Sequence, residues 1–230
     1  MTDSGADAER RLRAEAEVCQ RCPQLVSGRT QVVFASGPAD ANVMFVGEAP
    51  GASEDREGVP FVGASGKLLD QLLAGIELSR DDVYIANVLK CRPPENRDPR
   101  SDEIANCFSY LQRQVEIVAP TVVVTLGNFS TKLLRADDTV ISKIRGQAEP
   151  REIGSRRVWL LPVFHPAAAL YRRPNLELLR EDFELLPGLI GRGAPVQGGM
   201  AAPPAPSEPS AASAPDEDSD GDARPQLDLF

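Results

Sequence analysis

The chain has 230 residues, of which 42% are hydrophobic and 26% charged, so it can bury a core without needing disulfides or metals. No apolar run approaches the roughly 20 residues that cross a bilayer, and the polar, acidic start lacks the apolar region of a secretion signal, so we expect a cytoplasmic protein with no membrane partner. A formal net charge of -9 offers no general attraction for nucleic acid, so any DNA binding has to come from local basic loops.

The last part of the chain differs in composition from the rest. From Gly191 onward, seven acidic residues stand against two arginines, and seven prolines and five glycines accompany almost no aliphatic residues. Such a segment cannot offset the entropy of its ordering by burying apolar surface. We therefore predict one folded domain over residues 1–190, a disordered linker over 191–225 and a short apolar motif at 226–230.

Short β-branched runs alternate with segments of helical period through the first 190 residues. The predicted elements are a strand at 42–47, a helix capped by Ser65, a strand at 83–88, a helix capped by Ser101, a strand at 121–126, a short helix at 128–134, a hairpin around 153–155, a strand at 158–163 and a helix at 175–186. Near-continuous apolar strands that alternate with helices indicate a parallel sheet covered on both faces. The predicted class is α/β, with a mostly parallel four-stranded sheet.

Polar or glycine residues follow all four of these strands. The first strand runs into Gly-Glu-Ala-Pro-Gly at 47–51, the second into Asn87, the third into 127–128 and the fourth into His165. Ligands of open parallel sheets bind beyond the carboxyl ends of the strands, so we expect these residues to meet at one edge. Neither a G-x-G-x-x-G motif nor a phosphate-binding loop has the required spacing here, which disfavours a nucleotide.

The four cysteines are a separate signal. Cys19 and Cys22 form a C-x2-C pair, and Cys91 and Cys107 follow much later in the chain. Disulfides are disfavoured without an export signal, and the C-x2-C pair is too close for an unstrained bridge, so a four-thiolate metal site is favoured over scattered buried thiols. Zinc sites usually have two close pairs or a histidine partner, but the spacing leaves both zinc and an iron–sulfur cluster open.

Five motifs occur together in the order typical of one known family. They are Gly47-Glu-Ala-Pro-Gly51 with Glu54-Asp55, Gly58-Val-Pro-Phe-Val-Gly63, Asn87-Val-Leu-Lys-Cys-Arg-Pro-Pro94, Leu126-Gly127 and His165-Pro-Ala-Ala-Ala-Leu170. With the cysteines interleaved, they resemble the bacterial family 4 uracil-DNA glycosylases over about residues 15–187. The resemblance implies a three-layer α/β/α glycosylase fold, a [4Fe-4S] cluster on the four cysteines, and excision of uracil from single- and double-stranded DNA by a monomer.

The same resemblance assigns the residues that read the base. Uracil has to leave the duplex before its N1–C1′ bond can be cut. Phe61 is then expected to stack on the ring, and the Asn87 amide to pair with its O4 and N3 edge, which cytosine would mismatch. Gly47 borders this pocket, and Ala49 is expected to donate a backbone N–H to uracil.

The departing base places negative charge on uracil O2 and positive charge on the sugar. The resemblance assigns the contact with O2 to His165, whose N–H stabilises the developing anion. The group that activates water stays open, because this chain has Ala49 where family 1 enzymes have an aspartate. Glu48, beside the base pocket, and Glu54, on the same loop, are the two candidate carboxylates.

DNA contacts are expected from a few local residues. Ser65 and Lys67, near a helix start, and Arg172 and Arg173, after the histidine motif, are the candidates. Further basic residues flank the cysteines: Lys90, Arg92, Arg97 and Arg100.

The extreme C-terminus carries an apolar motif after a long acidic, proline-rich stretch. Its residues are Gln226-Leu227-Asp228-Leu229-Phe230. The motif resembles the Q-L-x-L-F peptides by which bacterial repair proteins bind the sliding DNA clamp. A 35-residue tether reaches on the order of 30 Å, enough for a clamp-bound enzyme to probe nearby DNA.

Two other classes of protein remain open. The chain would be an iron–sulfur redox protein, or a zinc-stabilised nucleic-acid-binding module, if it had the fold without the glycosylase activity. Alkali-induced strand scission at uracil separates the enzyme from both, and iron and sulfide content decides the metal.

Overall fold

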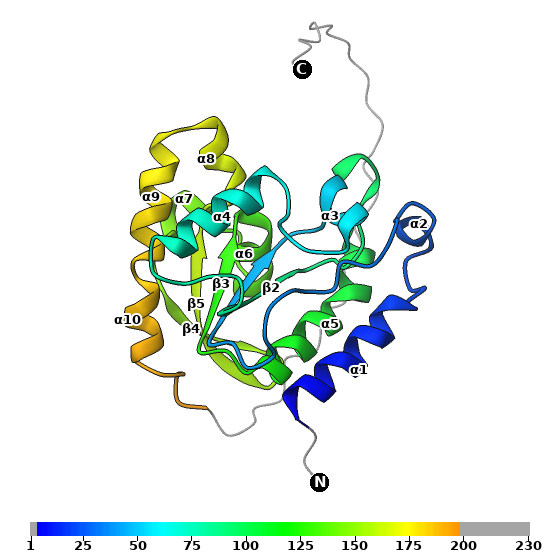
Figure 1. Ribbon diagram of the computed structural model, residues 1–230, viewed down its shortest axis with the longest axis horizontal. Coiled ribbons are helices and arrows are strands. Elements are labelled where there is room, and N and C mark those ends of the chain that lie inside the picture. Colours follow the sequence, from blue (N-terminus) through cyan, green and yellow to red (C-terminus); the bar gives the residue numbers. More distant parts are fainter. Residues whose placement is uncertain (1–3, 198–230) are drawn as a thin grey trace, which may run out of the picture.

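The structure is a computed structural model that describes residues 4–197 (Figure 1). Its elements in chain order are α1 (Gly5–Glu17), α2 (Pro23–Val26), β1 (Val43–Gly47), α3 (Ala52–Glu57), α4 (Ala64–Ala74), β2 (Val83–Asn87), a 3-10 turn η1 (Pro94–Asn96), α5 (Ser101–Val118), β3 (Val122–Leu126), α6 (Asn128–Arg135), α7 (Ile141–Ile144), β4 (Glu149–Ile153), β5 (Arg156–Val163), α8 (Ala167–Tyr171), α9 (Pro174–Phe183) and α10 (Leu186–Gly191). Residues 198–225 of the predicted linker 191–225, and the whole C-terminal motif, lie outside the described residues.

The strands form one sheet in the order β2-β1-β3-β5-β4. The first four strands of this order run parallel, and β4 is antiparallel to β5. Gly47 pairs with Asn87, and Leu126 pairs with Val163, so the carboxyl ends of the parallel strands meet at one edge. This confirms the α/β class and the mostly parallel sheet.

The prediction of four strands was wrong, because the structure has a fifth. The expected hairpin around 153–155 is present, and its first arm is the edge strand β4. Its sequence, Glu-Pro-Arg-Glu-Ile, has a single buried residue, Ile153. A polar, proline-containing edge strand lacks the apolar run by which the inner strands are found.

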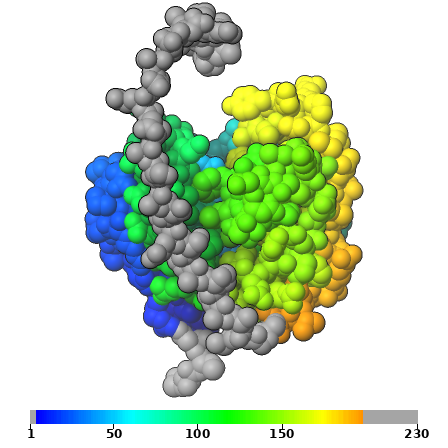
Figure 2. All heavy atoms as spheres, turned by 180° about the vertical axis from the view of Figure 1, so that it is seen from behind, coloured from blue at the N-terminus to red at the C-terminus, as the bar shows by residue number. Residues whose placement is uncertain are grey.

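Each face of the sheet has its own core. Met44 and Val46 point to one face and pack with α1, α5 and α6, whereas Val43 and Phe45 point to the other and pack with α4, α8, α9 and α10. Figure 1 shows α1 beside α5 on one side of the sheet, and α9 and α10 on the other side. Figure 2 shows the molecule from behind, where the surface formed by α1 and α5 is blue to green and the surface formed by the chain from β4 onward is yellow-green to orange. None of the helices in residues 4–197 combines the length and apolar character that a bilayer crossing requires.

Two predicted helix caps were wrong, and one predicted helix is divided. Ser65 and Ser101 lie inside α4 and α5, whose N-cap residues are Gly63 and Arg100. In both cases a glutamate side chain accepts a hydrogen bond from the N-cap backbone N–H. The helix expected at 175–186 ends at Phe183, and α10 begins at Leu186.

Candidate active site

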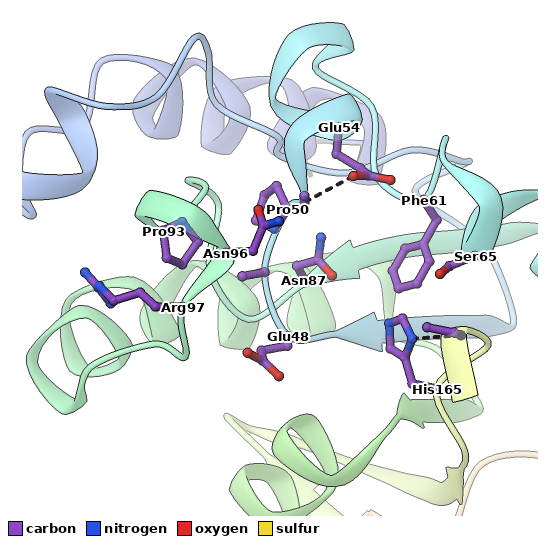
Figure 3. Close-up of a pocket in the computed structure, with 13 residues that line it drawn as sticks. Glu48, Pro50, Glu54, Phe61, Ser65, Asn87, Pro93, Asn96, Arg97 and His165 are labelled. Carbon is purple, nitrogen blue, oxygen red and sulfur yellow. Dashed lines mark hydrogen bonds between the residues drawn. The ribbon is translucent and has the colours of Figure 1, made fainter. Parts of the chain in front are cut away.

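A cavity of about 450 Å³ opens at the carboxyl edge of the parallel strands. It collects residues from the β1–α3 loop, the Phe61 loop, the end of β2, the loop before α5 and the start of α8. Figure 3 shows two walls with residues between them: Phe61 and His165 on one side, Pro93, Asn96 and Arg97 on the other, and Asn87 and Glu48 in the middle. The cavity therefore brings together five of the six residues expected to bind uracil, together with Ser65 and Glu54.

Gly47, the sixth residue, lies directly beneath this site. A Cβ atom at Gly47 would lie 2.3 Å from Asn87 Oδ1 and 2.7 Å from Phe61 Cζ. Any larger residue would therefore displace the amide or the ring. Glycine at the end of β1 is what allows both side chains to approach the strand.

Phe61 is held in a conformation that phenylalanine rarely adopts. Its φ is 55°, its side chain is buried, and its ring centroid lies 5.6 Å from that of His165. The Arg80 guanidinium donates to the carbonyls of both Phe61 and Pro60, and to the Asp70 carboxylate. A strained residue fixed by its surroundings at a cavity wall is typical of a functional site. Arg80 lies 19 residues further along the chain, and no local pattern in the sequence points to it.

Asn87 is the last residue of β2 and is only 2% exposed. Its Oδ1 is buried and has no hydrogen-bond partner among the described residues. A buried acceptor without a partner is costly unless a ligand supplies the donor. Ala49 N–H also has no acceptor within residues 4–197, so the cavity offers an unused acceptor and an unused donor to a bound base.

His165 is neutral, and its tautomer is fixed. Its Nδ1 accepts a hydrogen bond from Ala167 N–H at 3.1 Å, so the ring proton resides on Nε2. Burial lowers the pKa of His165 to about 4, against an opposing effect of the Glu54 charge. Gly127 follows β3 directly and has a φ of 92°. A Cβ atom at this position would lie only 3.1 Å from His165 Cβ, so the chain after β3 passes close to the histidine.

The two candidate carboxylates differ in their surroundings. Glu54 accepts hydrogen bonds from three backbone N–H groups, those of Gly51, Val62 and Gly63, each at 3.1 Å. These bonds join the β1–α3 loop to the loop that carries Phe61. The geometry of Glu54 is that of a structural clamp on the cavity wall.

The Glu48 side chain, by contrast, makes no hydrogen bond or ion pair with any residue in the described part of the chain. Its carboxylate lies in the middle of the site, where the cavity meets a second one of about 410 Å³ that is also lined by Asp98 and His165. Burial, with a smaller contribution from the Asp98 charge, raises the pKa of Glu48 above its ordinary value. An unpaired carboxylate with a raised pKa in a cleft is the usual form of a general base.

The loop between Cys91 and Cys107 supplies a cavity wall that the sequence analysis missed. Asn96 lies on this wall at φ 56°, and its Oδ1 accepts from Arg92 Nε at 2.8 Å. Arg97, which had been considered for DNA, forms two hydrogen bonds with Glu103 at 2.6 and 2.9 Å. This pairing lowers the pKa of Glu103 to about 2. The sequence signals for this wall were its proximity to the cysteines and the 87–94 motif, which includes Pro93 of the wall.

The candidate DNA contacts lie around the cavity. Ser65 lines it, Lys67 is exposed one turn into α4, and Arg172 and Arg173 are exposed between α8 and α9. Tyr171 precedes them at 88% exposure, with Leu170 also exposed. These two apolar residues beside a basic pair were not identified from the sequence.

Lys90 does not fit the surface role that the sequence suggested. Its side chain is wholly enclosed, and the residue is 2% exposed. It therefore cannot contact DNA.

The four cysteines come together between the N-terminal segment and α5. Cys19 and Cys22 lie between α1 and the start of α2, Cys91 follows β2, and Cys107 lies on α5. All four line one small enclosed cavity, and none forms a disulfide. Burial raises the pKa of the Cys107 thiol to about 11, so a metal is needed to hold this group as a thiolate.

Hydrogen-bond donors point at three of the sulfur atoms. Arg29 Nη1 lies 3.1 Å from Cys91 Sγ, and Asn106 Nδ2 lies 3.6 Å from Cys22 Sγ. The backbone N–H of the residue before Cys91 donates to Cys107 Sγ at 3.3 Å. Donors around thiolate sulfurs are typical of metal-bound cysteines, so this donor set fits a resident metal group.

Comparison with known proteins identifies the family. Residues 34–186 match the Uracil DNA glycosylase superfamily. The type-4 uracil-DNA glycosylase of Sulfurisphaera tokodaii is 46% identical over 184 residues, which cover 77% of this chain and 83% of that protein. Those of Archaeoglobus fulgidus and Thermotoga maritima are each 44% identical, over 77% and 72% of this chain and 90% and 86% of their own lengths. The chain belongs to the uracil-DNA glycosylase superfamily and, within it, to the type-4 enzymes.

Proposed function

We propose that the cavity at the carboxyl edge of the sheet is where this enzyme holds an extruded uracil while its N-glycosidic bond is hydrolysed. As a uracil-DNA glycosylase of base excision repair, the protein releases free uracil and leaves an abasic site in DNA. Phe61 stacks on the base, and Asn87 and the Ala49 N–H pair with its polar edge. The unpartnered Asn87 Oδ1 supports this assignment, because the N3–H of uracil supplies the missing donor.

The observation that carries the mechanism is the hydrogen bond from Ala167 N–H to His165 Nδ1. Since Nδ1 is occupied by Ala167 N–H, Nε2–H remains to donate to uracil O2. That hydrogen bond strengthens as the N1–C1′ bond breaks and its electron pair moves onto the base. A pKa of about 4 means that the imidazole is neutral at pH 7, so it stabilises the anion as a hydrogen-bond donor without having to lose a proton.

Glu48 is the carboxylate that we assign to the sugar side of the reaction. Its charge offsets the positive charge that develops on C1′, and it accepts a proton from the water that attacks this carbon. Glu54 is less suited to this role, because both of its oxygens are occupied by loop N–H groups. We assign Glu54 to the stability of the pocket.

We assign DNA holding to the exposed residues at the rim. Lys67, Arg172 and Arg173 contact phosphates, with Ser65 at the cavity edge. Leu170 and Tyr171 are placed to fill the space that the extruded nucleotide leaves, as apolar wedges do in other proteins that distort DNA.

The four cysteines are proposed to hold a [4Fe-4S] cluster. The four cysteines line one small cavity, and hydrogen-bond donors point at three of their sulfur atoms, as is typical of cluster-bound cysteines. A cluster there would join the N-terminal segment to the loop that forms the cavity wall. Iron and sulfide content decides between the cluster and zinc.

A contact with the sliding clamp is proposed from the sequence alone. The motif Gln226-Leu227-Asp228-Leu229-Phe230 lies outside the described residues. Deletion of 227–230 is expected to abolish capture by a bacterial clamp and to leave excision on a short oligonucleotide unchanged. Equal capture with and without these four residues would refute this contact.

The excision assay tests the proposed pocket directly. The full-length protein is incubated with single- and double-stranded oligonucleotides that carry one uracil, and the strands are then treated with alkali. We expect scission at uracil only, and its loss in an Asn87→Ala variant that keeps the iron and sulfide content of the wild type. Equal excision by that variant would show that the pocket is elsewhere.

A further inference from the structure

Lys90 is a buried cation next to the residue that we assign to base reading. Its Nζ donates to the main-chain carbonyl of Asn87 at 2.6 Å and to Gln114 Oε1 at 2.5 Å. The ammonium also lies 5.8 Å from the centroid of the Phe34 ring. A lysine buried this deeply is uncommon unless its ammonium has specific partners.

The carbonyl of Asn87 needs this partner because of its place in the sheet. β2 is the edge strand, so one side of it has no neighbouring strand. On that side, Ile85 exchanges two backbone hydrogen bonds with Ser36, and the Lys90 ammonium binds the Asn87 carbonyl two residues further on. Without Lys90, a buried carbonyl at the end of the strand would lose its donor.

The backbone of Lys90 is itself fixed on both sides. Its N–H donates to Cys107 Sγ at 3.3 Å, and its carbonyl accepts from Val33 N–H at 2.8 Å. Gln114 is held in turn by its amide bonds to the Phe34 carbonyl and the Tyr84 hydroxyl. The position of the ammonium therefore depends on the cysteine site and on α5.

We infer that Lys90 is a positioning residue for uracil recognition: it fixes the backbone of Asn87, and with it the amide that reads the base, from a segment tied to Cys107. This inference rests on the proposed role of Asn87. On this inference, the cysteine site and the base pocket belong to one rigid unit. The Lys90 side chain joins them by returning to the carbonyl of Asn87, three residues earlier in the chain.

A double-mutant cycle tests the inference. Lys90→Met removes the ammonium and keeps an unbranched apolar side chain, and Lys90→Met/Gln114→Met also removes the amide that would be left without its partner. Single-turnover excision of uracil and oligonucleotide affinity are measured for each, with and without Asn87→Ala. Visible absorption, iron content and melting temperature establish that each variant is folded and loaded.

We expect Lys90→Met to reduce the rate of uracil excision only when Asn87 is present. Lys90→Met should slow excision by about 10-fold or more when Asn87 is present, as for a lost hydrogen bond to a charged group, but by less than about 2-fold in the Asn87→Ala background. Tyr84→Phe is the matched control, because it removes a hydroxyl one step further along the same network and leaves both Lys90 bonds intact. It should change melting temperature without changing excision.

The outcomes separate this inference from the proposed function. If Asn87→Ala excises uracil normally, the assignment of Asn87 fails. If Asn87→Ala is impaired but Lys90→Met costs the same factor in both backgrounds, or costs nothing, the positioning role is wrong and the assignment of Asn87 stands. If neither Lys90 variant folds with its metal site, Lys90 is a folding residue and the inference is overturned.

Discussion

Glu48 and Glu54 lie six residues apart, and the structure predicts opposite consequences for the same chemical change at each. Glu54→Gln replaces one acceptor oxygen with an NH2 group, which then faces the N–H of Gly51 or the N–H groups of Val62 and Gly63. At least one charge-assisted hydrogen bond is lost, and a backbone donor is left unpaired. We expect the free energy of unfolding to fall by about 3 kcal/mol, which lowers the melting temperature by roughly 6–12 °C in a domain of this size.

Glu48→Gln should leave stability intact and remove activity. The Glu48 carboxylate has no partner among residues 4–197, and its burial disfavours the charged form, which is why its pKa is raised. An uncharged amide is therefore tolerated at least as well in the folded state. The substitution removes the negative charge that we propose to offset the positive charge on C1′. The single-turnover excision rate should therefore fall by about 100-fold, as for other preorganised electrostatic contacts.

The assay pairs thermal unfolding with single-turnover excision on a single-stranded uracil oligonucleotide, which avoids the cost of unpairing. Excision by Glu54→Gln is measured below its melting transition, where we expect weaker substrate binding and a nearly normal rate at saturation. The reasoning is refuted if Glu48→Gln excises uracil at the wild-type rate, or if Glu54→Gln melts at the wild-type temperature while its saturated rate collapses.

Three further substitutions have distinct expected results. His165→Ala should lower the single-turnover rate by roughly 10²- to 10³-fold while oligonucleotide affinity, measured by fluorescence anisotropy, is retained; an unchanged rate would exclude a role in stabilising the anion. Asn87→Asp should erode the preference for uracil over cytosine, since a carboxylate accepts from the cytosine amino group, and unaltered uracil release would place Asn87 outside the pocket. Cys107→Ser should yield a colourless, less stable protein, and a melting temperature equal to that of the wild type would show that the cysteines are incidental.

The sequence predicted the sheet and the place of the site because both follow from local patterns. Near-continuous apolar strands are found by composition, and a polar residue directly after such a strand has to lie at its carboxyl end. Asn87 and His165 are recognisable in this way. The first arm of the predicted hairpin was not recognised as a strand of the sheet, and helix α1 was not predicted, because each buries few residues: Ile153 in β4, and Leu12 and Ala16 in α1.

The roles of individual charged residues depend on contacts that no local pattern contains. Two glutamates on one loop look equivalent until the Phe61 loop folds back and surrounds Glu54 with N–H groups. In the sequence, Lys90 resembles a surface residue because other basic residues lie near it. Its burial is explained by the edge position of β2, which leaves the Asn87 carbonyl in need of a donor. Arg80 and Phe61 are separated in the sequence by the whole of α4, yet the Arg80 guanidinium donates to the Phe61 carbonyl.

The claim that a neutral His165 donates from Nε2 is open to one direct measurement. The chain has a single histidine, so protein labelled with 15N-histidine gives one imidazole to follow by NMR as a function of pH. Because burial lowers the pKa to about 4, the ring should stay neutral from pH 8 down to about pH 5, with the proton on Nε2, and should take up a second proton only below that range. A ring that is protonated at pH 7, or that carries its proton on Nδ1, would contradict the mechanism.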